Sequence, residues 1–207
     1  MKKFFAFIAA AFMAISVSAQ SDAGSFTLKP NVGFTYTTAT GDFGKKFNGG
    51  FALTAGVEGM YMVNEKFGAA LGVNLTGHNT TWELLDDVVC SNYYFNIPVT
   101  ANYYVAPGLA IKAGVAFNFL TTAKIDGYDE YDFGIAKLDV KDLYKSNFIS
   151  IPVGLSYEIS DFVFDARYNF GVSKVADANF GLKRVSRSAE ASDGSFNAFS
   201  FTVGYKF

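Results

Sequence analysis

The chain has 207 residues with 17 basic and 19 acidic side chains, and half of its residues are hydrophobic. This length suits one domain, and the slightly acidic balance argues against nucleic acid as a partner. After the N-terminal region no segment holds eighteen consecutive apolar residues, which excludes a helical membrane protein; strands that alternate apolar and polar residues can still cross a bilayer.

The first segment has the layout of a secretory signal. Two lysines precede an apolar run from Phe4 to Val17, and small residues follow at the positions that a signal peptidase reads. We expect cleavage before Gln20, which makes residues 1–19 a signal peptide and residues 20–207 the mature barrel domain. The alternative is an uncleaved membrane anchor, but the apolar run is shorter than the roughly 20 residues that span a bilayer.

Eight later segments alternate apolar and polar residues with the period of a β-strand. Each is near or above the length of roughly 9 to 11 residues that a tilted strand needs to cross a membrane. The last of them ends the chain on an aromatic residue, Phe207, as the closing strand of an outer-membrane barrel does. The predicted strands are 26–38, 50–63, 67–77, 92–105, 109–120, 148–158, 162–172 and 196–207.

The connections alternate between tight turns and long polar segments. The turns are 64–66, 106–108 and 159–161, and the long segments are 39–49, 78–91, 121–147 and 173–195. Short periplasmic turns and long external loops are typical of outer-membrane barrels. The sequence therefore predicts an all-β fold, an eight-stranded antiparallel up-and-down transmembrane β-barrel.

Two prolines recur at matching places in this pattern. Pro98 and Pro152 each follow an isoleucine and precede a valine in a strand before a tight turn. Because proline cannot donate a hydrogen bond to a neighbouring strand, we expect a bulge or a kink at both positions.

Charges inside the predicted strands fall on one face only. The opposite face is uninterrupted by Asp, Glu, Lys or Arg, as lipid requires, because a basic residue facing lipid near the midplane costs roughly 2 to 4 kcal/mol. The charged residues that we expect to point into the barrel are Lys29, Glu58, Lys112, Glu158, Asp165, Arg167 and Lys206.

Four of these charges form the main candidate site. Glu58, Lys112, Asp165 and Arg167 are two acids and two bases, each a few residues from a short turn. Buried charges must be paired, so we expect a lumen charge network that plugs the barrel. The alternative is a selectivity cluster in a narrow pore.

Candidates for chemistry are few, and no cofactor or metal site is expected. Cys90 is the only cysteine, so it forms no internal disulfide, and a free loop thiol or an intermolecular bridge is the weaker hypothesis for it. His78 is the only histidine, and we expect an exposed loop residue. A weaker hypothesis makes His78 the base of a catalytic triad, which needs three groups brought together. The partners considered are Thr80, Thr81 or Ser91 as nucleophile and Asp86 or Asp87 as acid.

The long segments offer ligand hypotheses. The carboxylates of 121–147 predict a solvated acidic loop, or alternatively a Ca²⁺ site, although they lack the spacing of a known calcium loop; they are Asp126, Asp129, Glu130 and Asp132. Basic residues of 173–195 predict a charged loop, or contacts with lipopolysaccharide phosphates; they are Lys183, Arg184 and Arg187. Trp82 is either an interfacial girdle residue or a contact point.

Several segments together resemble a known family. They are residues 164–172 (FDARYNFGV), residues 141–145 (KDLYK), the strands with Pro98 and Pro152, and the terminal Phe207. They are similar to the small outer-membrane β-barrel family, often labelled porin family, which includes PorT-like proteins of Gram-negative bacteria.

The resemblance implies a place in the outer membrane and three kinds of partner. These are outer-membrane lipid and lipopolysaccharide, the barrel-insertion machinery, which would recognise the closing strand with Tyr205 and Phe207, and an extracellular or envelope protein at the loops. An eight-stranded barrel is just wide enough for side chains to fill it. We therefore expect a non-enzymatic membrane anchor; the alternatives are a narrow channel and, third, a lipid-modifying enzyme.

Overall fold

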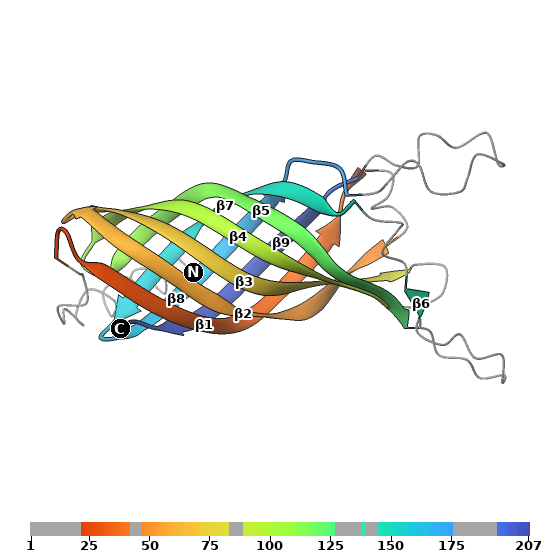
Figure 1. Ribbon diagram of the computed structural model, residues 1–207, viewed down its shortest axis with the longest axis horizontal. Coiled ribbons are helices and arrows are strands. Elements are labelled where there is room, and N and C mark those ends of the chain that lie inside the picture. The colour runs from red at the N-terminus through yellow and green to blue at the C-terminus, as the bar shows by residue number, and fades with distance from the viewer. Residues whose placement is uncertain (1–21, 42–46, 83–88, 127–137, 140–144, 176–193) are drawn as a thin grey trace, which may run out of the picture.

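The computed structural model describes residues 22–41, 47–82, 89–126, 138–139, 145–175 and 194–207, and all structural statements below refer to these residues. They form a closed barrel of antiparallel strands (Figure 1). Within these ranges no helix is long and apolar enough to span a bilayer. Residues 1–19 lie outside them, so the signal peptide stays a prediction.

Eight long strands form the wall of the barrel. Each pairs antiparallel with its neighbours in the chain, and β1 pairs with β9 to close the sheet. The expected eight-stranded up-and-down barrel is thus confirmed. The wall strands are β1 (Phe26–Ala39), β2 (Phe47–Asn64), β3 (Phe67–Trp82), β4 (Val89–Ala106), β5 (Leu109–Asp126), β7 (Asn147–Ile159), β8 (Phe162–Gly171) and β9 (Phe196–Tyr205).

A further strand, which the sequence did not predict, lies outside the wall. β6 (Leu138–Asp139) has two residues and pairs with Lys124 and Ile125 of β5. In Figure 1 it lies at the end of the barrel opposite the short turns and the C-terminus. We call these the long-loop end and the short-turn end.

Side chains alternate between the two faces of the wall. Apolar residues point outward, and Leu53, for example, is 73% exposed. The seven charged residues expected to point inward do so: six are buried, and the side chain of Lys206 is 12% exposed. The periodicity of the sequence therefore assigned the lipid face and the lumen face correctly.

Four strands extend further toward the long-loop end than the sequence predicted. β2 begins at Phe47, β3 continues to Trp82, β4 begins at Val89 and β5 continues to Asp126. In a barrel with a polar interior, inward Thr, Asn and Ser side chains are compatible with a strand, so polarity alone did not mark where these strands end. As a consequence, His78 and Cys90 lie in strands and not in loops.

The expected bulges at the two prolines are absent from the described strands. β3 and β4 have the same register on both sides of Pro98, and β5 and β7 have the same register on both sides of Pro152. Each proline instead interrupts one ladder at a glycine. A Cβ on Gly72 would lie 2.9 Å from Cγ of Pro98, so the missing side chain makes room for the ring.

Candidate functional site in the barrel lumen

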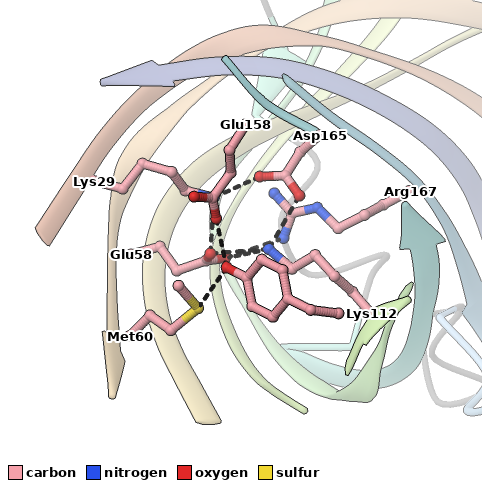
Figure 2. Close-up of polar contacts among 8 residues, drawn as sticks. Lys29, Glu58, Met60, Lys112, Glu158, Asp165 and Arg167 are labelled. Atoms are coloured by element: carbon pink, nitrogen blue, oxygen red, sulfur yellow. Dashed lines mark hydrogen bonds and ion pairs between the residues drawn. The ribbon is translucent and has the colours of Figure 1, made fainter. Parts of the chain in front are cut away.

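The centre of the site is a group of buried charges that four strands bring together (Figure 2). Glu58 of β2 forms ion pairs with Lys112 of β5 and Lys29 of β1. The Nζ atoms of Lys112 and Lys29 lie 2.9 and 2.8 Å, respectively, from Oε1 of Glu58. Asp165 of β8 contacts the same two lysines, with Lys112 Nζ 3.0 Å from Oδ1. Two carboxylates and two ammonium groups thus alternate around one point in the lumen.

Arg167 of β8 completes the group, which we call the lumen charge network: Lys29, Glu58, Lys112, Asp165 and Arg167. Its Nη1 lies 3.8 Å from Oε2 of Glu58, an ion pair longer than a hydrogen bond. The structure therefore brings together the four residues that the sequence singled out. It adds Lys29, which lies directly opposite Glu58 in the register of β1 and β2.

A second polar cluster lies nearer the short-turn end. Glu158 of β7 accepts a hydrogen bond from the Tyr104 hydroxyl and pairs with Lys206, whose Nζ lies 2.7 Å from Oε2. Tyr104 also packs with Met62 and Ala110 in a buried apolar cluster. Side chains therefore fill the lumen from the charge network toward this end.

Aromatic side chains fill the lumen nearer the long-loop end. His78 of β3 is 5% exposed and stacks on Phe196, with the ring centroids 5.7 Å apart, while Tyr94 and Phe148 meet it edge-on. Its Nδ1 lies 2.9 Å from the Thr37 hydroxyl. We call His78, Tyr94, Phe148 and Phe196 the aromatic layer.

The expectation of an exposed loop histidine was therefore wrong. The polar residues from Gly77 to Thr81 suggested a loop at the rim of the barrel. In the structure they continue β3, and His78 points into the lumen. Aromatic side chains from β4, β7 and β9 enclose its ring there. The polar contact of His78 that the structure shows is with Thr37, which no catalytic hypothesis included.

Among the described residues, none of the other proposed triad members forms a hydrogen bond with His78. Thr80 is buried in β3, Thr81 and Ser91 are partly buried at the ends of β3 and β4, and Asp86 and Asp87 lie outside the described residues. The alternative of a loop thiol at Cys90 was also wrong, because this residue is buried in β4. Among the described residues no group of three or more His, Cys, Asp and Glu side chains could hold a metal ion.

Most of the loop candidates lie outside the described residues, and their hypotheses stay untested. This holds for Asp129, Glu130 and Asp132, and for Lys183, Arg184 and Arg187. Trp82 and Asp126 are the last residues of β3 and β5.

A family model for the outer membrane protein beta-barrel domain matches residues 5–207. The chain belongs to this family. This outer-membrane barrel protein is thus placed in the outer membrane, as the sequence predicted. No curated protein matches its sequence.

Solved structures support the fold of the outer-membrane barrel. Ail, the attachment invasion locus protein of Yersinia pestis, has a TM-score of 0.51 at 16% identity, covering 89% of this chain and 99% of Ail. Neisserial surface protein A (NspA) has the same TM-score at 13% identity, covering 90% of this chain and all of NspA. Ail has also been solved in complex with the heparin analogue sucrose octasulfate, at 14% identity. At these identities the likeness concerns the fold alone.

The C-terminus lies at the seam that closes the outer-membrane barrel. Phe207 and Leu28 of β1 exchange two backbone hydrogen bonds, of 2.9 and 3.2 Å. The Phe207 ring is 72% exposed on the outer face and packs on Tyr205, with the centroids 4.8 Å apart. Tyr205 in turn donates a hydrogen bond to Asp161 in the last short turn. Of the two residues considered as an assembly signal, Phe207 thus lies at the seam, and Tyr205 connects it to the last short turn and to β8.

Proposed function

We propose that the protein is a non-enzymatic outer-membrane anchor, whose side-chain-filled barrel holds its long loops at the cell surface. The main observation behind this proposal is that side chains fill the lumen at several positions along the barrel axis. Ion pairs link β1, β2, β5 and β8 across the interior, and the aromatic layer lies between them and the long-loop end.

The space left between the charge network and the aromatic layer is small. A cavity of about 20 Å³ lies there, lined mainly by Asn, Thr and Ser side chains and bounded by Arg167 and His78. One water needs roughly 10 to 15 Å³ of such space, so the cavity has room for one or two. An open pore needs a wider barrel, since eight strands enclose little more than their own side chains. This supports an anchor over the alternative, a narrow channel.

The surroundings of His78 support a non-enzymatic role. A general base must reach the proton that it removes, either directly or through one water. Aromatic rings enclose His78, and its polar contact is the Thr37 hydroxyl. We therefore propose that His78 packs the lumen.

For the loops we propose contacts with anionic surface groups. The sequence motivates this through Lys183, Arg184 and Arg187, which can bind lipopolysaccharide phosphates by charge-assisted hydrogen bonds. An envelope protein at the loops is the other proposed partner. Lipopolysaccharide pull-down with the purified protein and with a triple K183Q/R184Q/R187Q variant tests the first proposal. Equal capture of both proteins would contradict it.

Solute flux tests the anchor role against the channel. We expect liposomes that contain the folded protein to swell in an iso-osmotic solution of a small sugar no faster than empty liposomes. Swelling that slows as the sugar becomes larger would show a pore and overturn the proposal.

Loop display is tested on intact cells. An epitope inserted in 173–195 should be labelled by antibody from outside, whereas the same epitope in the turn 106–108 should be labelled only after the outer membrane is permeabilised. The opposite labelling pattern would contradict the orientation.

A further inference from the structure

The buried charges of the lumen do not balance. The charge network holds three cations, Lys29, Lys112 and Arg167, against two carboxylates, Glu58 and Asp165. The nearby pair of Glu158 and Lys206 is neutral by itself. With all of these side chains ionised, the described lumen carries one positive charge in excess, in a place where an uncompensated charge costs much free energy.

The excess is located at Arg167. Both carboxylates of the network are already bound by Lys29 and Lys112 at 3.1 Å or less, whereas Arg167 reaches Glu58 only at 3.8 Å. A guanidinium group has five N–H donors. None of these donors makes a hydrogen bond to an acceptor in the described part of the chain, although Arg167 is only 7% exposed.

Arg167 also borders the cavity below the aromatic layer, together with two hydroxyl groups of β9. Ser200 lies directly opposite Arg167 in the register of β8 and β9, and its Oγ accepts a hydrogen bond of 3.1 Å from Asn169, so that its own proton remains for another acceptor. Thr202 is 2% exposed, and its Oγ1 finds no hydrogen-bond partner among the described residues. One wall of the cavity therefore presents donors beside a positive charge.

We propose that this cavity is a binding site for one small inorganic anion of the halide class, with chloride as its natural occupant. The guanidinium of Arg167 and the hydroxyls of Ser200 and Thr202 hold the ion, which neutralises the excess charge of the network. A water molecule would fit the same volume of about 20 Å³ and accept the same hydrogen bonds, but it would leave the charge uncompensated.

Crystallography with bromide tests the site directly. The protein is refolded and crystallised in sodium bromide without chloride, so that the ion can enter during folding. We expect an anomalous difference peak in the cavity, within contact distance of Arg167, Ser200 and Thr202. Absence of a peak there, or bromide found only on the protein surface, would overturn the proposal.

The effect of the ion on stability gives a second test. An anion that binds only the folded barrel stabilises it, so the urea midpoint of wild type in micelles should be higher in sodium chloride than in sodium gluconate at equal ionic strength. Thr202→Val removes one donor and should abolish most of this shift. The matched control is Thr100→Val, because Thr100 is also buried and without a described partner but does not line the cavity. An equal shift in both variants would contradict the site.

Discussion

The Lys112 ammonium group lies 2.9 and 3.1 Å from the two carboxylate oxygens of Glu58, although the residues are 54 positions apart in the chain and on strands three places apart around the barrel. Both side chains are nearly inaccessible. Their contact spans the lumen and joins walls that no backbone ladder connects. It therefore links opposite sides of the wall, and in the anchor role that we propose it also blocks the passage of solutes.

Removal of one partner should destabilise the barrel strongly. Lys112→Met keeps most of the side-chain volume but removes the ammonium group that contacts both Glu58 and Asp165 at 2.9 to 3.1 Å, so we expect a loss of about 3 to 5 kcal/mol in the free energy of unfolding. Urea unfolding in micelles measures it. The control is Lys66→Met in the exposed turn before β3, which should change stability by less than about 0.5 kcal/mol. Equal effects of the two changes would contradict this link across the lumen.

Arg167 should behave differently from Lys112. It has one ion-pair contact at 3.8 Å, whereas Lys112 contacts both carboxylates closely. We expect Arg167→Met to cost less than Lys112→Met in the same unfolding experiment, because Glu58 and Asp165 keep their close contacts with Lys29 and Lys112. A larger cost for Arg167→Met would show that this residue, and not Lys112, holds the network together.

Cys90 should be inaccessible in the folded protein. It is 2% exposed within β4, so a maleimide reagent should label it at least roughly tenfold more slowly in folded micellar protein than in urea, as expected for an inert buried thiol. Mass spectrometry follows the labelling. Rapid labelling of the folded form would mean that the start of β4 opens in solution.

Deletion of Phe207 should impair assembly in cells more than folding in vitro. The deletion removes two backbone hydrogen bonds to Leu28 and the terminal aromatic residue of the closing strand. We expect a sharp fall in the amount that reaches the outer membrane, while the truncated chain still folds in micelles and runs faster unboiled than boiled on a denaturing gel. The control is Phe199→Ala, which removes an outward aromatic residue from the same strand. Failure of the truncated chain in both tests would show that Phe207 is needed only for closure.

Sequence periodicity predicted the wall of the barrel because lipid outside and polar groups inside impose opposite chemistry on alternate residues. It also identified Glu58, Lys112, Asp165 and Arg167 as charges that share one lumen. The sequence pattern did not identify Lys29 as a member of the network. Whether Lys29 lies beside Glu58 depends on the register between β1 and β2, which the alternation of residues alone does not determine. Lys29 joins the network because it pairs directly with Glu58 across the β1–β2 ladder.

The burial of His78 could not be read from its neighbours in the sequence. Its partners come from other strands, Thr37 from β1, Tyr94 from β4 and Phe196 from β9. The pattern Gly-His-Asn-Thr-Thr is typical of a loop in a soluble protein. Inside a barrel it continues a strand, because the lumen accepts polar side chains and the aromatic layer supplies the packing.

Ion conductance in a planar bilayer tests the filled lumen most directly. With protein shown to be folded by its gel mobility, we expect no current above that of a detergent control. Reproducible conductance steps in wild type, with an ion selectivity that changes in Glu58→Gln, would show that the charge network lines an open pore. That result would contradict the account of the barrel as an anchor.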